Sequence, residues 1–213
     1  LFRSRYYGPQ TSRPLPARKP QDEPEQSGIR RVTLKAPADL PVVLMAYRVP
    51  VIRDVDNDVD PYALDMLSAI LDGHDAARFS KHLVREQRLA VSASAGYAAV
   101  TRGPGLFYVQ GSPSAGRSRA ELEAGFRAEI ARIVESGVSE EELARARAQL
   151  VAGQVYKLDS MFAQAMEIGQ LEAVGIPHAA GKRMIEKLQA VTAASVQAVA
   201  ARYLVDEIGR AHV

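Results

Sequence analysis

The sequence has 213 residues, of which 47% are hydrophobic and 24% are charged, and its formal net charge is +2. Such a chain can fill the core of one large domain or two small ones. The small charge excess, with no dense block of Lys and Arg, argues against a nucleic-acid partner. The absence of cysteine excludes a disulfide scaffold and thiolate metal sites, and no apolar run approaches the roughly 20 residues of a membrane helix.

Prolines are concentrated near the N-terminus, where five of the twelve lie between residues 9 and 24. Proline fixes the backbone angle φ and removes a hydrogen-bond donor. We therefore predict that residues 1–27 form an extended, semi-rigid interdomain linker. The chain begins with Leu and shows no signal-peptide pattern. We interpret it as a piece of a longer protein that has a further domain upstream.

Two strands and a helix are predicted next. Apolar and polar residues alternate over Ile29–Leu34, which indicates an edge or half-buried strand. Val42–Val49 is so continuously apolar that it predicts a central strand covered on both faces. Asp60 followed by proline is typical of a helix start, with the Asp60 carboxylate as the N-cap. Apolar residues at helical spacing continue this helix to Gly73.

The middle of the chain is predicted to form a helix at about Ala77–Glu86, followed by strands at Leu89–Val100 and Leu106–Gln110. From there the pattern is helical. An apolar stripe runs from Leu122 to Val134, and Ser139 with Glu142 forms the capping box that begins the next helix.

Three more helices complete the prediction. Asp159 or Ser160 caps the first, which carries Phe162 and Met166, and the last ends near Leu204. Early strands and late helices predict an α+β, two-layer domain over residues 28–206. Its sheet is mixed or mainly antiparallel, with the helices packed on one face. Residues 207–213 break the pattern and resemble the translation of a sequencing adapter, so no role is assigned to them.

Metal-binding motifs were sought around the four histidines. None of them begins H-x-x-E-H or H-E-x-x-H. His82 and Glu86 lie one helical turn apart and share a face, yet no second histidine accompanies them. We interpret this pair as part of a solvated helix face. We predict no catalytic residue and no metal ligand in this chain, and leave its substrate-binding residues unknown.

Other patterns resemble functional motifs incompletely. Asp54, Asp56, Asp58 and Asp60 alternate like the start of a calcium loop, although Val59 occupies the position of the obligatory glycine. A solvated connection between a strand and a helix is the interpretation that we favour. Gly175–Lys182 is one residue too long for a phosphate loop, and Arg183 follows where Ser or Thr is required.

Several segments together resemble the pitrilysin/insulinase family of zinc peptidases, which carry an inverted H-x-x-E-H motif. The segments are Arg5–Pro9, Leu71–Gly73, Ala77–Phe79, Leu83–Ala90 and Gly137–Leu143, and the resemblance covers roughly residues 5–206. It is closest to the non-catalytic second lobe of the zinc-bearing half. The last lobe of the family's other half supplies an Arg and a Tyr that contact substrate. Val84 and Val91 stand at those positions here, which argues against that lobe.

The resemblance implies an α+β lobe without a metal, in a protein whose zinc site lies in a missing upstream lobe. It implies the upstream catalytic lobe, a second two-lobe half (fused or separate) and a peptide substrate as partners. The parent is then a zinc endopeptidase, although the fragment alone is inactive. Bacterial relatives are often exported, which points to the periplasm, but the residues themselves leave the compartment open.

Two alternatives remain at this stage. The parent is an assembly or core subunit of the same family that has lost catalysis, or the chain is an independent calcium- or ligand-binding module. The sequence upstream of Leu1 discriminates the first alternative, and a calcium titration discriminates the second.

Overall fold

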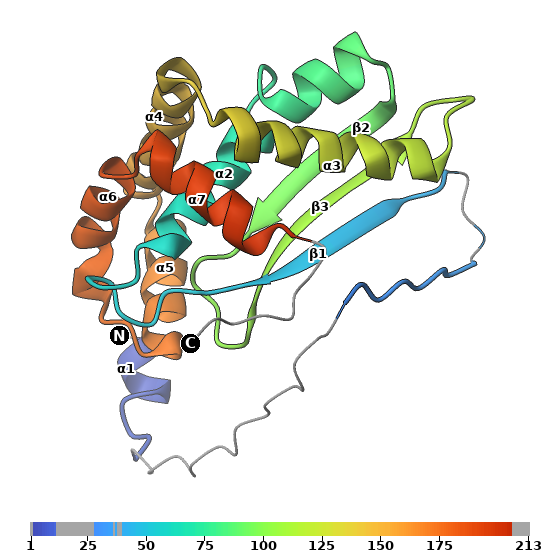
Figure 1. The fold of residues 1–213 in the computed structure, drawn as a ribbon. Helices are drawn as coiled ribbons and strands as arrows, with labels where there is room; N and C mark the ends of the chain where they lie inside the picture. Colours follow the sequence, from blue (N-terminus) through green and yellow to red (C-terminus); the bar gives the residue numbers. More distant parts are fainter. Residues whose placement is uncertain (1, 12–27, 36, 38–39, 206–213) are drawn as a thin grey trace.

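A computed structural model describes residues 2–11, 28–35, 37 and 40–205. A three-stranded antiparallel sheet carries helices on one of its faces (Figure 1), which confirms the predicted α+β class. The strands are β1 (Val43–Val49), β2 (Ala90–Tyr97) and β3 (Gly105–Pro113), in the order β1-β3-β2. The helices are α1 (Phe2–Tyr6), α2 (Asp60–Asp72), η1 (Phe79–Glu86), α3 (Arg119–Ser136), α4 (Glu140–Lys157), α5 (Met161–Val174), η2 (His178–Ala180), α6 (Gly181–Gln189) and α7 (Ala193–Tyr203).

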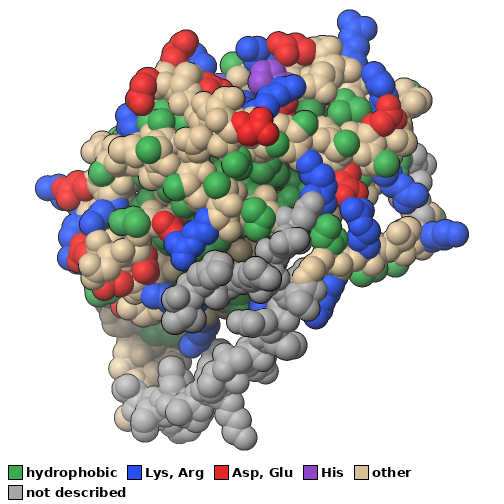
Figure 2. All heavy atoms as spheres, viewed as in Figure 1, with side chains coloured by type: hydrophobic (Ala, Val, Ile, Leu, Met, Phe, Trp, Pro, Cys, Tyr) green, Lys and Arg blue, Asp and Glu red, His purple; other side chains and the backbone are tan. Residues whose placement is uncertain are grey.

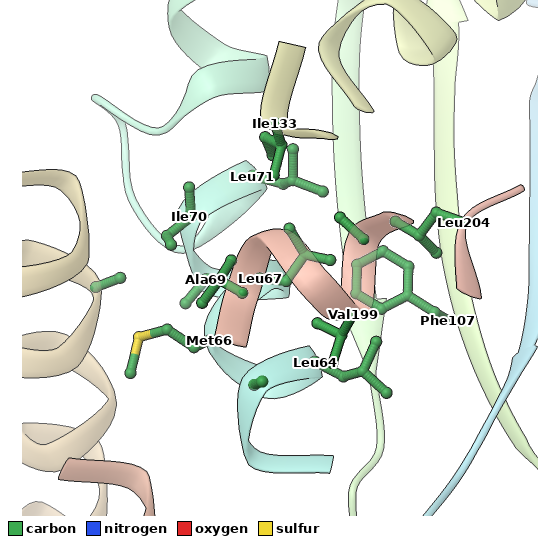
Figure 3. Packing of buried hydrophobic residues seen from close by; sticks show 14 of the residues in the cluster. Leu64, Met66, Leu67, Ala69, Ile70, Leu71, Phe107, Ile133, Val199 and Leu204 are labelled. Atoms are coloured by element: carbon green, nitrogen blue, oxygen red, sulfur yellow. The ribbon is translucent and has the colours of Figure 1, made fainter. Parts of the chain in front are cut away.

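Helix α2 is the centre of the core. Nine of its 13 residues are buried, because the helix packs on β2 and is covered in turn by α4 and α7. A helix that is apolar on nearly every side has to be enclosed in this way. Leu64, Leu67 and Leu71 are fully buried, among Phe107 of β3 and Val199 of α7 (Figure 3).

Strand β3 is the central strand, and α3 lies close against it. Every second residue of β3 from Gly105 is buried. Gly111 pairs with Val43 on one side and Ala93 on the other. A side chain at Gly111 would collide with the Ser92 carbonyl and would press on the Phe126 ring. Glycine is therefore the residue that permits this helix–sheet approach.

The prediction of a central strand at Val42–Val49 is wrong in its position within the sheet. Strand β1 forms there, but among the described strands it pairs with β3 alone and therefore lies at an edge of the sheet. Its inward residues Tyr47 and Val49 are buried, whereas Leu44 on the other face is 62% exposed. The outward residues Leu106 and Tyr108 of β3 are exposed as well. The sheet thus has an apolar outer face that no described element covers. Strand β1 is therefore apolar on both faces, as a strand buried on both faces would be, although only one of its faces is buried.

The predicted strand at Ile29–Leu34 does not form. The backbone there pairs with no strand, and Ile29, Val32 and Leu34 are all exposed. The segment is attached instead through Arg31, whose guanidinium donates two hydrogen bonds of 2.7 and 2.6 Å to the Glu123 carboxylate. Alternation alone was an insufficient signal, because a strand also needs a partner strand.

Two predicted helix caps are confirmed, and one is wrong. Ser139 and Glu142 form a complete capping box at α4, and Ser160 caps α5. Asp60 begins α2 as predicted, but it makes no capping bond. Its carboxylate accepts hydrogen bonds from the Tyr203 hydroxyl (2.6 Å) and the Arg202 guanidinium (3.1 Å). Asp60 therefore joins the first long helix to the last.

Two other predictions concern the ends of the chain and the membrane. Residues 12–27, which include most of the predicted linker, and the tail 207–213 lie outside the described residues, so both interpretations stay predictions. The linker's first residues contain the short helix α1. Among the described residues, no helix has the length and apolar character to cross a membrane.

If Asp60 joins α2 to α7, Asp60→Ala and Tyr203→Phe should not have additive effects on stability. Each should cost about 1–2 kcal/mol, and the double variant should cost clearly less than the sum, because both remove one charged hydrogen bond. Urea unfolding of the four proteins at pH 7 measures this. Asp75→Ala, at an exposed carboxylate, is the control. Strict additivity would contradict the assignment.

Asp65 is a carboxylate on the largely apolar helix α2. Burial raises the pKa of Asp65 from 3.8 to about 6, although the positive charge of Lys157 opposes the rise. A raised folded-state pKa means that the folded protein binds the proton more tightly than the unfolded chain does. The stability gained by protonation is complete below about pH 4 and is lost as the pH rises through about 6.

Asp65→Asn should therefore stabilise the protein at pH 7, by on the order of 1–3 kcal/mol, because a neutral side chain loses less on burial than a carboxylate. Between pH 4 and pH 7 the wild type should lose stability relative to the variant. Chemical denaturation across this pH range gives both curves. Parallel curves would show that Asp65 titrates normally.

Candidate functional site

The candidate site is an open crevice of about 690 Å³ between η1 and the N-terminal turn of α4. Charged side chains of both signs line it, and acid–base and metal sites are usually built from such side chains. The lining residues are Ala76, Arg78, Lys81, His82, Arg85, Glu86, Ser139, Glu141, Glu142 and Arg145.

One wall of the crevice is a π-helix, where the sequence predicted an ordinary helix at Ala77–Glu86. Its wide turns end with the Gln87 N–H donating to the His82 carbonyl, 2.9 Å away. Phe79 and Leu83 are fully buried on its inner side, and Arg88 just beyond it has a positive φ of 48°. π-Helical turns are rare and often occur at functional sites, which makes this wall the first place to examine for chemistry.

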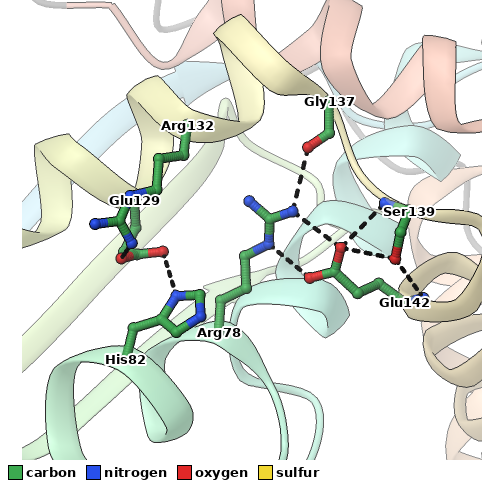
Figure 4. A network of polar contacts seen from close by, with 7 residues as sticks. All are labelled: Arg78, His82, Glu129, Arg132, Gly137, Ser139 and Glu142. Atoms are coloured by element: carbon green, nitrogen blue, oxygen red, sulfur yellow. Dashed lines mark hydrogen bonds and ion pairs between the residues drawn. The ribbon is translucent and has the colours of Figure 1, made fainter. Parts of the chain in front are cut away.

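Glu129 of α3 lies behind this wall and is the one buried charged residue in the described part of the chain, with no exposed surface. Figure 4 shows its carboxylate between two partners. One oxygen lies 2.8 Å from His82 Nδ1, and the other accepts a 2.6 Å hydrogen bond from Arg132. Both carboxylate oxygens are thus engaged, as a buried carboxylate requires.

Arg78 joins η1 to α4 on the other side of Figure 4. Its guanidinium donates to both oxygens of Glu142, at 2.8 and 3.0 Å, and to the Gly137 carbonyl at 3.2 Å. These hydrogen bonds from Arg78, assisted by those from Ser139, lower the pKa of Glu142 to about 2. A carboxylate whose pKa lies this far below neutral pH is a poor general base.

Several of the charged side chains that line the crevice are therefore engaged in ion pairs. Arg145 binds Glu141 across one helical turn, and Arg78 occupies Glu142. His82 is directed to Glu129 and not to Glu86, so the pair considered from the sequence does not come together as a metal site. Within the described residues, no group of three or more His, Asp or Glu side chains could hold a metal ion. This arrangement fixes helices in place and offers no activated nucleophile.

The aspartate-rich loop is also occupied by protein groups. Asp58 accepts hydrogen bonds from the backbone N–H of Arg53 and of Asp54, at 2.7 and 2.8 Å. Asp56 forms an ion pair with Arg183 of α6 at 2.9 Å. The loop thus connects the N-terminal end of α2 to α6, which is a structural role. Asp60, which follows the loop, connects α2 to α7.

The remaining positions considered from the sequence are scattered. His178 bonds locally to Glu172 at the end of α5, and His74 accepts from the backbone of Ala76. Val84 packs against the core, whereas Val91 is exposed on β2 beside a β-bulge. Gly175 is the left-handed C-cap of α5, so Gly175–Lys182 is a connection between helices. His212 lies outside the described residues.

Glu129 is the polar residue that the sequence analysis missed. It occurs on α3 among the apolar residues Phe126, Ile130 and Ile133, where helical spacing alone places it beside them. The available signal was its position on the inner stripe of α3, next to Arg132.

Charge on the surface is mixed in sign. In the face seen in Figure 2, Lys and Arg alternate with Asp and Glu around the outline, with hydrophobic side chains between them. A nucleic-acid surface concentrates positive charge on one face. The face seen in Figure 2 shows no such concentration.

A family model identifies the family of this chain, and solved structures share its fold. Residues 4–150 match the family model described as the Peptidase M16 inactive domain. No curated protein sequence matches the chain. A protease from Helicobacter pylori has a similar structure, with a TM-score of 0.84 at 18% identity, over 95% of this chain and 48% of its own. This chain thus spans about half the length of that protease.

Two further structures share the fold. The inactive peptidase domain of a protein named as a zinc protease from Bordetella parapertussis gives a TM-score of 0.69 at 21% identity, over 82% of this chain and 91% of its own. A chain of complex III from Candida albicans gives 0.62 at 17% identity, over 80% of this chain and 42% of its own. At these identities the structures establish the fold alone.

This chain belongs to the Peptidase M16 inactive-domain family, because the family model covers more than half of it. The predicted resemblance to the pitrilysin/insulinase peptidases is confirmed, and the chain is a non-catalytic lobe. The ion pairs that line the crevice are consistent with a structural role for this lobe.

The Arg78–Glu142 pair should contribute measurably to stability, unlike the neighbouring Arg145–Glu141 pair. Arg78 and Glu142 are only 12% and 25% exposed in their side chains, against 45% and 80% for Arg145 and Glu141. Arg78→Met should cost about 1–3 kcal/mol at pH 7, and Arg145→Met less than about 0.5 kcal/mol.

The pH dependence provides the check. A lowered carboxylate pKa contributes stability that is present above the unfolded value of 4.5 and is lost as the pH falls toward about 2. The difference between wild type and Arg78→Met should therefore shrink between pH 5 and pH 2 in chemical denaturation. Equal costs for both variants at pH 7 would disprove the distinction.

Proposed function

We propose that this chain is the second lobe of the zinc-bearing half of an M16 zinc endopeptidase, in which it supports an upstream catalytic lobe and walls part of the peptide chamber. The observation that carries the proposal is the match of residues 4–150 to the M16 inactive domain. The Bordetella parapertussis domain, named as part of a zinc protease, supports it. In the whole protein, the zinc belongs to the upstream lobe.

The contribution of such a lobe is mechanical. A hydrolase gains rate by holding the scissile bond in a fixed geometry, so a rigid wall matters without any reacting group. The fully buried leucines of α2, the Arg78–Glu142 pair and the Asp60–Tyr203 bond are all contacts that hold helices in fixed relative positions. A second two-lobe half, fused or separate, completes the proposed chamber.

A second candidate is a core or assembly subunit without catalysis. It is favoured by the similarity in fold to a chain of complex III, which covers 80% of this chain. The two candidates differ in the upstream lobe, since only a peptidase needs an intact H-x-x-E-H motif and a downstream glutamate ligand.

The test begins with the gene upstream of Leu1 and continues with the full-length protein. We expect an H-x-x-E-H motif there, one zinc per chain after dialysis, and cleavage of unstructured peptides that is lost when the first motif histidine is changed to alanine. The 213-residue chain alone should hold no stoichiometric zinc and cleave no peptide. A degenerate motif in a protein without zinc would favour the assembly subunit.

In the full-length protein, His82→Ala should leave kcat/KM for peptide cleavage unchanged within about twofold, once it is corrected for the folded fraction. The reason is that the His82 ring lies 2.8 Å from the buried Glu129 carboxylate, which gives it a structural partner within this lobe. The variant is expected to lose about 1–3 kcal/mol of stability, since it leaves a buried carboxylate short of one partner. Loss of turnover in a folded His82→Ala protein would show that this lobe takes part in the chemistry.

A further inference from the structure

Helix α5 has two apolar sides, and the described residues cover only one of them. Leu171 is buried, and Ala163 and Val174 on the same side are partly buried. The opposite side carries large hydrophobic residues at helical spacing. Met161 is 89% exposed and Phe162 is 76% exposed. A soluble helix normally places polar residues on its outer face.

Exposed apolar residues continue from α5 to the end of α4, and together they are here called the α5 surface. It consists of Val155, Tyr156 and Leu158 at the end of α4 with Met161, Phe162, Met166 and Ile168 of α5, each at least 46% exposed. Ala165 and Gly169 lie between them on α5 and are also exposed. Exposed apolar patches of this kind mark contact surfaces, and Met and aromatic residues are enriched in such contacts.

The attachment of α5 to the rest of the lobe points the same way. Among the described elements, α5 packs chiefly on the short helix η2, whereas α2, α3 and α7 pack on the sheet and on one another. The helix nevertheless has a regular Ser160 N-cap and a glycine C-cap. An apolar helix with well-formed ends and little packing of its own requires a further body to bury its outer side.

We propose that the α5 surface is the contact site for the upstream lobe of the same polypeptide. This inference rests on the proposed two-lobe protein. The Helicobacter pylori protease matches 95% of this chain, and about as much chain again lies outside the match. That additional chain provides the body that the α5 surface requires. In the view of Figure 1, α1 lies at the same end of the molecule as α5, and its exposed Tyr6, followed by Tyr7, adds aromatic surface at that end.

Methionine oxidation tests the contact without changing the protein. Met161 and Met166 should react rapidly with hydrogen peroxide in the 213-residue chain, because both are exposed. In the full-length protein, each should react at least tenfold more slowly at a concentration where the protein is monomeric. Met66, which is fully buried in α2, is the internal reference for a protected methionine in both proteins. Mass spectrometry of the digested protein gives the rate for each residue.

A pair of variants separates the α5 surface from general exposure. Phe162→Gln in the full-length protein should restore at least part of the Met161 reactivity, since glutamine keeps helix propensity but removes the apolar contact. Leu106→Gln, at a residue that is 51% exposed on the outer face of the sheet, should leave Met161 protected. Neither side chain is buried in this lobe, so both variants should fold.

Three results would overturn the proposal. Full reactivity of both methionines in the monomeric full-length protein would show that no lobe covers them. Protection that depends on protein concentration would assign the surface to a second copy, and protection only on addition of peptide would assign it to substrate. The measurement of the oxidation rates requires neither bound zinc nor peptidase activity. A parent without a zinc motif would therefore refute the proposed peptidase and leave this test intact, whereas an active peptidase with reactive methionines would refute the contact alone.

Discussion

The lobe depends above all on the enclosure of helix α2. Its side chains are apolar in nearly every direction, and the chain has to supply neighbours on all of those sides. The sheet, α4 and α7 do so, and Leu64, Leu67 and Leu71 have no exposed surface as a result. Large-to-small changes at such positions typically cost 2–5 kcal/mol, a large share of a domain's stability. Strand β2 and the later helices α4 and α7 thus converge on one early helix.

The polar interactions serve the same end. Asp60, Asp56 and Arg78 each connect elements far apart in the sequence. Pairing of this kind adds little energy per contact at the surface, but it fixes which helix lies beside which. It also removes reactivity, because Glu142 is held with a pKa of about 2 by the Arg78 hydrogen bonds. A carboxylate that is held in such an ion pair has too low a pKa to act as a general base.

Local signals in the sequence were sufficient for most elements and insufficient for their environment. The capping box at Ser139 and the cap at Ser160 are read from neighbouring residues and are confirmed. Asp60 has the local features of a cap, yet its partner Tyr203 lies 143 residues away, and no local pattern encodes that bond. Strand β1 was placed correctly along the chain but at the wrong position in the sheet, because an apolar outer face reads like a buried one. In the candidate site, Glu129 was missed because its burial depends on η1 crossing α3.

The misplacement of β1 and the exposure of α5 have a common physical cause. An apolar residue in a sequence pattern predicts a buried side chain, but it does not indicate whether the residues that bury it belong to the same lobe. Leu44 on the sheet and Phe162 on α5 are both exposed here, and a sequence pattern cannot separate them from the core residue Phe107. Exposed apolar surfaces of this kind favour aggregation when nothing covers them, and for the α5 surface the proposed upstream lobe is the cover. Exposed apolar residues such as Phe162 therefore mislead a prediction of the core for this lobe alone, because they reflect a contact with a body outside it.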